Sequence, residues 1–227
     1  IVHKGKELEA STDFNLVSAG EKYYLWEASP HTGRNHQIRI HAQSVGISIL
    51  GDSKYEGTSF PFLCLHNKQI KFPNGIIITS RPPPFYENLK ILHDKILSTA
   101  LFEIERRKRF FQFAINSDQI FRLVHNQNGS LDPGYTLDHY GDWLVANWFH
   151  SVWSERDQER FSAIAEWLGK PIVINFQSIK DKRQICVGRQ QTQASIENVK
   201  ESKTVYEVNL ASGLSTGLIL NQRLHRK

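Results

Sequence analysis

The chain has 227 residues, of which 40% are hydrophobic and 22% are charged, and its formal net charge is +5. That length allows one large domain or two small ones, with a proper hydrophobic core. The mild excess of basic residues suits a nucleic-acid partner. Cys64 and Cys186 lie far apart and form no C-x-x-C pattern, which indicates neither a disulfide framework nor a zinc site. A reducing, cytoplasmic location is therefore expected, and no metal.

No apolar run approaches the roughly 20 residues that span a bilayer, so no membrane partner is expected. Residues 1–9 are polar and lack the hydrophobic core of an export signal. The sequence contains no methionine, even at position 1. Either the chain is a piece of a longer protein, or modified methionines are missing from its printed sequence.

The first part of the chain is predicted to consist mainly of short strands. Turn residues separate them, including an Asn-Gly pair at 74–75. The expected strands are residues 12–17, 22–28, 47–50, 63–72 and 76–79. One helix is predicted over residues 34–45, because Ile38, Ala42 and Val45 recur at spacings of four and three.

Residues 32–41, TGRNHQIRIH, hold two arginines, two histidines, a glutamine and an asparagine. Arg34 and Arg39 are five positions apart, so on a helix they diverge by roughly 140° at 100° per residue. Separate roles are therefore expected for the two arginines. Arginine grips phosphate or carboxylate with two parallel hydrogen bonds, which makes this segment a candidate anion-binding site. The alternative is a solvated basic helix start without a specific function.

Three consecutive prolines at 82–84 predict a boundary between domains 1–86 and 87–227, because proline lacks the backbone N–H that helices and central strands need. A long helix is expected over residues 87–114. It carries a basic cluster at 106–109, which either contacts RNA or forms a solvated face.

The remaining chain is predicted to alternate strands with one helix. That helix begins after Ser154, a good N-cap with Asp157 three residues later, and ends at Gly169. The expected strands are residues 120–125, 135–140, 142–148, 172–176, 183–187 and 204–210. The fold class is therefore α+β, with mixed and antiparallel sheets and packed helices in two domains or part-domains.

The segment TGRNHQIRIH is followed by Leu-Gly-Asp at 50–52, by Tyr55 and Gly57, and then by Leu-His at 65–66. This order resembles the third conserved motif and its sequel in the large-ribosomal-RNA pseudouridine synthases, over about residues 3–86. The resemblance implies the C-terminal part of a catalytic domain that isomerises uridine to pseudouridine in RNA without a cofactor.

In that family an aspartate of an Arg-Leu-Asp motif attacks the uridine, and this chain contains no such motif. The resemblance makes Arg39 the partner of that catalytic carboxylate, because a nearby guanidinium keeps a carboxylate charged and aimed. The other candidate residues of the site would bind RNA. They are Arg34, His36, Gln37, Arg106 and Arg107.

A second resemblance covers about residues 95–227. The pattern NG-x-x-x-PG-x-x-x-D-x-YGDWLV at 128–145, and TG-x-x-LNQR-x-x-R at 216–226, are similar to the middle domain of ribosomal RNA cytosine-5 methyltransferases. Residues 130–132 read as an insertion, and Asn221 replaces the family's aspartate. The resemblance places Gln222 and Arg223 at the border of an S-adenosylmethionine site. That cofactor is expected only if a methyltransferase domain follows.

The two resemblances together predict a segment of a longer, bifunctional protein that modifies ribosomal RNA. Its partners would be RNA and the missing upstream and downstream segments of the same protein. The chain alone is expected to be inactive. Two alternatives remain: a non-catalytic RNA-binding module in which Trp143, Trp148 and Trp153 stack on bases, or the front part of a ribosomal RNA methyltransferase.

Overall fold

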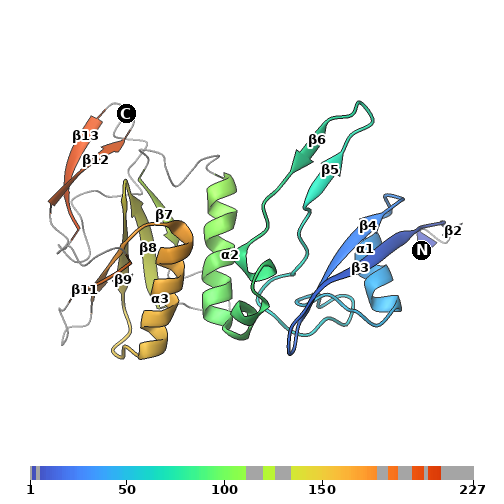
Figure 1. The fold of residues 1–227 in the computed structure, drawn as a ribbon, viewed down its shortest axis with the longest axis horizontal. Coiled ribbons are helices and arrows are strands. Elements are labelled where there is room, and N and C mark those ends of the chain that lie inside the picture. The colour runs from blue at the N-terminus through green and yellow to red at the C-terminus, as the bar shows by residue number, and fades with distance from the viewer. Residues whose placement is uncertain are drawn as a thin grey trace. The chain divides into compact units, whose positions relative to one another are not determined.

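A computed structural model of the chain describes residues 2–3, 6–110, 120–125, 134–177, 184–188, 196–201 and 204–210. The chain divides into two compact units, Ile1–Thr99 and Ala100–Lys227 (Figure 1). The described elements form an α+β fold with mixed and antiparallel sheets, as the sequence predicts. No helix in these ranges is long and apolar enough to cross a membrane.

The first unit is built on an antiparallel pair, β3 (Thr12–Ala19) and β4 (Tyr24–Pro30). These match the first two predicted strands. Alternation gives the pair one mainly apolar face and one polar face. The apolar face includes Phe14, Leu16, Trp26 and Ala28, whereas Asp13, Asn15, Glu27 and Ser29 lie on the polar face. The helix α1 (Gln37–Ser44) contacts both strands. A short pair, β1 (Val2–His3) and β2 (Lys6–Glu7), precedes them.

The structure corrects three predictions in this unit. The helix begins at Gln37 rather than at residue 34, because the preceding residues form a turn in which Gln37 N donates to Arg34 O. Residues 47–50 are not a strand, since they enter a tight turn in which Asp52 N donates to Ile49 O. The expected strand 63–72 shrinks to β5 (Gln69–Lys71), which forms a two-stranded sheet with β6 (Ile77–Thr79).

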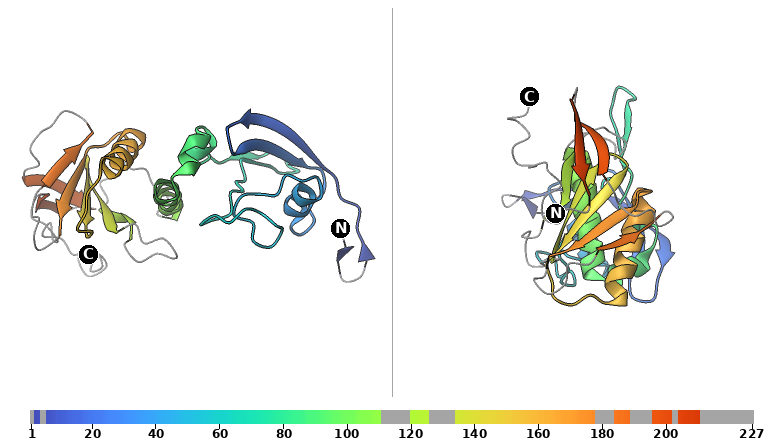
Figure 2. Two further views of the ribbon diagram at one scale, coloured as in Figure 1. Left: turned by 90° about the horizontal axis from the view of Figure 1, so that it is seen from below. Right: turned by 90° about the vertical axis from the view of Figure 1, so that its left-hand side faces the viewer.

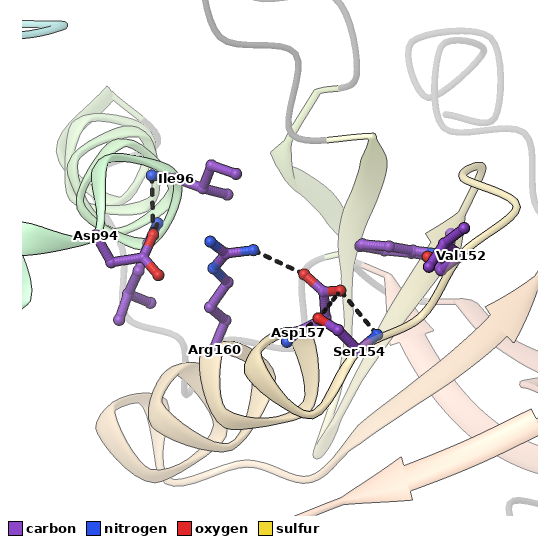
Figure 3. Close-up of polar contacts among 8 residues, drawn as sticks. Asp94, Ile96, Val152, Ser154, Asp157 and Arg160 are labelled. Atoms are coloured by element: carbon purple, nitrogen blue, oxygen red, sulfur yellow. Dashed lines mark hydrogen bonds and ion pairs between the residues drawn. The ribbon is translucent and has the colours of Figure 1, made fainter.

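The long helix predicted over 87–114 begins later than expected, because capping side chains interrupt the chain before residue 95. The 3-10 turns η1 (Pro84–Tyr86) and η2 (Leu89–His93) precede α2 (Lys95–Phe110). Asn88 accepts a hydrogen bond from Lys90 N and caps η2. The carboxylate of Asp94 accepts from Ile96 N and Leu97 N at 3.1 and 3.0 Å, and so begins α2 afresh (Figure 3). Residues 111–114 lie outside the described residues.

The second unit contains a five-stranded sheet in the order β11-β10-β9-β8-β7. Its strands are β7 (Phe121–Val124), β8 (Tyr135–Tyr140), β9 (Trp143–Trp148), β10 (Ile172–Phe176) and β11 (Gln184–Val187). Only β9 and β10 are parallel, and α3 (Glu155–Leu168) connects them as a crossover helix. All five strands were predicted within one residue at each end, because their apolar runs are bounded by clear turn residues.

The two faces of this sheet are covered differently (Figure 2). On one face Phe161 of α3 packs against Tyr135 and Trp148, with ring centroids 4.8 and 6.2 Å apart. On the other face, apolar residues of the hairpin β12 (Ile196–Glu201) and β13 (Thr204–Asn209) join Val145 and Val173 in a buried cluster. The sequence predicted β13 but missed β12, whose charged residues hide its alternation.

The helix α3 begins and ends as predicted. Ser154 N donates to the carboxylate of Asp157 at 3.0 Å while Asp157 N donates back to Ser154 Oγ at 3.3 Å, which is a capping box (Figure 3). Arg160 also donates to Asp157 at 2.7 Å. Gly169 ends the helix with φ of 66°, a conformation that glycine adopts without strain.

We expect Ser154→Ala to lower the free energy of unfolding of the second unit by about 1 kcal/mol, because it removes the N-cap acceptor. Denaturant unfolding followed by tryptophan fluorescence would measure this, since most tryptophans lie in that unit. The exposed Ser151, which precedes the helix, is a matched control. Ser151→Ala should change stability by less than about 0.5 kcal/mol. Equal effects of the two changes would contradict the capping role.

Candidate functional site

The side-chain amide of Gln37 organises the start of α1. Its oxygen accepts from Thr32 Oγ1 at 2.6 Å and from Arg34 N at 3.0 Å. Its nitrogen donates to Ser11 O at 2.8 Å and to Thr12 Oγ1 at 2.9 Å. All four hydrogen-bonding positions of this buried amide are therefore used. Gln37 ties the TGR turn to the beginning of β3, so its main role here is structural.

Arg34 lies in this turn, before the helix, and its side chain is exposed. Within the described part of the chain, its side chain makes one long hydrogen bond, from Nε to Glu9 O at 3.3 Å. The two arginines do not share a helix, so the angle expected between them does not apply. They nevertheless have different surroundings, because Arg34 is solvated and has no carboxylate within ion-pair distance among the described residues.

The turn that follows α1 presents Asp52. Gly57 N donates to Asp52 O at 2.8 Å, and Gly51 N donates to Thr58 O at 2.8 Å. The backbone approaches itself so closely that a Cβ on Gly51 would lie 1.9 Å from Phe62 O, and one on Gly57 would lie 2.0 Å from Ile49 O. Only glycine fits these two positions. Asp52 Oδ1 accepts from Lys54 N and Tyr55 N, both at 3.2 Å, and this fixes the carboxylate on the turn.

Arg39 of α1 binds this carboxylate with two parallel hydrogen bonds. Nε donates to Asp52 Oδ2 at 2.7 Å and Nη2 donates to Oδ1 at 2.6 Å. The Asp52 side chain has no exposed surface, and the Arg39 side chain is 20% exposed. Hydrogen bonds from Arg39 lower the pKa of Asp52 despite its burial, and the same bonds raise the pKa of Arg39. Both groups are therefore charged at neutral pH.

Aromatic rings complete the cluster. The Tyr55 ring centroid lies 4.9 Å from Arg39 Cζ, a cation–π contact. His36 Nδ1 lies 2.9 Å from Tyr55 Oη, within hydrogen-bond distance. His36 adopts a left-handed conformation with φ of 55°, which is uncommon outside glycine. We define Arg39, Asp52, Tyr55 and His36 as the arginine cluster.

The sequence singled out Arg39 and His36 but missed the roles of Asp52 and Tyr55. The motif LGD-x-x-Y carried the signal, because an aspartate and a tyrosine three residues apart can meet in one turn. No local sequence pattern predicts that this turn folds back onto α1.

The other predicted site residues lie elsewhere. Arg106 is exposed and pairs with Glu103 at 2.8 Å. Arg107 is partly buried, donates from Nη1 to Arg122 O at 3.3 Å, and has its pKa lowered by burial. Arg107 is therefore less accessible to RNA than Arg106. Gln222 and Arg223 lie outside the described residues.

Two of the tryptophans expected to stack on bases, and both cysteines, lie in structural surroundings. Trp148 is 4% exposed, and the half-buried Trp153 has one face stacked on Phe161. Burial raises the pKa of Cys64 to about 12 and also raises that of Cys186, which keeps both thiols protonated. No group of three His, Cys, Asp or Glu residues suited to a metal occurs in the described ranges.

No family model matches the chain. A ribosomal large subunit pseudouridine synthase C of Rickettsia prowazekii is 52% identical over 66 residues, 27% of this chain and 22% of that protein. An uncharacterized RNA pseudouridine synthase of Chlorobaculum parvum is 46% identical over 50 residues, 22% of this chain and 15% of that protein. The dual-specificity RNA pseudouridine synthase RluA of Pasteurella multocida is 40% identical over 65 residues, 25% of this chain and 30% of that protein.

A solved structure described as a SAM-dependent methyltransferase from Streptococcus mutans is 19% identical, with a TM-score of 0.45, and covers 83% of this chain and 51% of its own. The resemblance to RNA pseudouridine synthases is thus confirmed over short segments, and similar solved structures carry methyltransferase names. The chain spans between 15% and 30% of the length of the three curated relatives above.

We expect Asp52→Asn to lower the free energy of unfolding of the first unit by about 3 kcal/mol at pH 7, because it leaves a partly buried guanidinium without its charge partner. The pKa of Asp52 is lowered by folding, so its contribution is complete above the unfolded-state pKa of about 4. The contribution is lost as the pH falls through the still lower folded-state pKa. The difference between parent and variant should therefore shrink in acid.

Hydrogen exchange of the α1 amides, measured in denaturant at pH 7 and below pH 4, would test this expectation. Asp13→Asn is the matched control, because Asp13 pairs with His31 at a site where both side chains are more than half exposed. If Asp52→Asn were as mild as the control, the ion pair would not support the fold.

Proposed function

We propose that this chain forms part of the active site of an RNA pseudouridine synthase, which isomerises uridine to pseudouridine in ribosomal RNA. The observation that carries this proposal is the arginine cluster, in which Asp52 and Tyr55 pack against Arg39 of the TGRNHQIRIH segment. It holds one guanidinium rigidly and leaves donors of that guanidinium available. The partial matches to curated RNA pseudouridine synthases support the reaction class.

In this proposal Arg39 pairs with the catalytic aspartate, which a segment outside the printed sequence would supply. A guanidinium beside that carboxylate would keep it charged and correctly oriented for attack on the uridine. The exposed Arg34 would bind an RNA phosphate, and His36 and Arg106 would make further RNA contacts. Arg107 and Gln37 would support these groups rather than contact RNA first. The reaction needs no cofactor.

The second half of the chain favours a bifunctional protein through its sequence resemblance to ribosomal RNA methyltransferases. S-adenosylmethionine would then bind to a domain that follows the described residues, with Gln222 and Arg223 near its border. A cytoplasmic location suits both activities. A non-catalytic RNA-binding role is disfavoured by the burial of Trp148 and by the stacking of Trp153 on Phe161, because such a role was expected to use these rings for stacking.

The purified 227-residue chain should not convert uridine to pseudouridine, because the sequence contains no Arg-Leu-Asp motif. The full-length product of the gene should do so in ribosomal RNA. Mass spectrometry of nucleosides after digestion would measure both. Turnover by the chain alone would show that it holds another nucleophile. RNA methylation without pseudouridine formation by the full-length protein would favour the methyltransferase alternative.

Arg34→Ala should weaken RNA binding across sequences and reduce the slope of log affinity against log salt by about one unit, because an exposed charge releases counterions. Arg39→Ala should leave this slope nearly unchanged, since Asp52 already neutralises Arg39. RNA affinity measured at several salt concentrations would separate the two. Lys71→Ala, which removes an exposed charge outside the TGRNHQIRIH segment, controls for the loss of any surface charge. Equal changes of this slope for both arginine variants would contradict separate roles and would indicate only a basic surface.

A further inference from the structure

We propose that Asp52 is a positioning residue that fixes the guanidinium of Arg39, so that the unused edge of this guanidinium is presented to a second carboxylate. This inference rests on the proposed function and adds a role for Asp52, with Tyr55 as its support. Asp52 itself would not contact RNA, because its side chain has no exposed surface.

The first step is the count of donors. A guanidinium carries five N–H groups, of which Asp52 takes one on Nε and one on Nη2. Both N–H groups of Nη1 and one of Nη2 have no hydrogen-bond partner among the described residues. The free N–H groups of Nη1 and Nη2 can donate two parallel hydrogen bonds to a second carboxylate, as Nε and Nη2 do to Asp52.

The second step is the rigidity of Asp52. Its Oδ1 also accepts from two backbone amides of its own turn, Lys54 N and Tyr55 N. The turn is itself fixed by Gly51 and Gly57, which allow backbone contacts that no side chain would permit. Asp52 therefore transfers the rigidity of the turn to the side chain of α1.

The third step is the plane of the guanidinium. The Tyr55 ring contacts Arg39, and Tyr55 Oη lies 2.9 Å from His36 Nδ1. Hydrogen bonds on one edge and an aromatic ring together leave few orientations for the guanidinium. Asp52 offsets the charge of Arg39 at long range, but the free edge of the guanidinium would still donate two charge-assisted hydrogen bonds to a second carboxylate. Such bonds lower the pKa of that carboxylate and fix its position.

The decisive experiment uses the 227-residue chain and needs no activity. We expect the Arg39 Nε–H to be visible by NMR and protected from exchange with water. Asp52→Asn should accelerate this exchange by at least about tenfold, or about 1.4 kcal/mol, because it replaces charge-assisted hydrogen bonds with weaker neutral ones. Asp13→Asn should leave it unchanged. Unchanged exchange in a folded Asp52→Asn variant would overturn the proposal.

A second experiment uses the full-length protein and a double-mutant cycle on kcat. Asp52→Asn and Arg39→Lys should each lower kcat by roughly tenfold or more, with little change in KM for RNA. The double variant should be no slower than Arg39→Lys alone, because Asp52 acts through Arg39. Independent, multiplicative losses would show that Asp52 acts in another way and would overturn the proposal. If the full-length protein makes no pseudouridine, the proposed function fails, and the exchange measurement still decides whether Asp52 fixes the Arg39 guanidinium.

Discussion

A carboxylate without exposed surface must be paired, because an isolated buried charge costs several kcal/mol. Asp52 meets this constraint with two hydrogen bonds from Arg39 and two from the amides of its own turn. The pair joins α1 to the turn that follows it. Both the geometry of the arginine cluster and the position of that turn depend on this one interaction.

The two arginines differ mainly in whether a carboxylate is paired with their positive charge. Arg34 is exposed on a turn that Gln37 holds in place, so its positive charge is not offset by a paired carboxylate in the described ranges. Arg39 is neutralised by Asp52 and contributes direction instead. In the proposed site, Arg34 would attract a polyanion and Arg39 would orient a reacting group. The same residue type could serve both roles because only Arg39 has a carboxylate partner among the described residues.

The second unit is stabilised by apolar packing on both faces of one sheet. The aromatic rings of Trp148, Trp153 and Phe161 gather on the face covered by α3. Valines from β9, β10 and the β12–β13 hairpin meet on the other face. This packing buries Trp148 and covers one face of Trp153. It also leaves the exposed Arg106 as the accessible member of the predicted pair in the basic cluster.

The sequence by itself determined the features that neighbouring residues encode. It predicted the fold class, the five sheet strands of the second unit, and α3 with its cap at Ser154 and its end at Gly169. Apolar periodicity and capping residues act over a few positions, so they can be read without a structure. A local signal also gave a wrong start for one helix. The apolar periodicity after residue 87 predicted a continuous helix, whereas α2 begins only after the cap at Asp94.

Tertiary structure alone decided what depends on distant segments. The pairing of Arg39 with Asp52 joins residues 13 positions apart, and the contacts of Gln37 with Ser11 and Thr12 join residues 26 and 25 positions apart. The start of α1, the short β5 and the hidden strand β12 likewise depend on which segment lies opposite. Sequence patterns name the groups able to hydrogen-bond, whereas chain closure decides which of them come within reach.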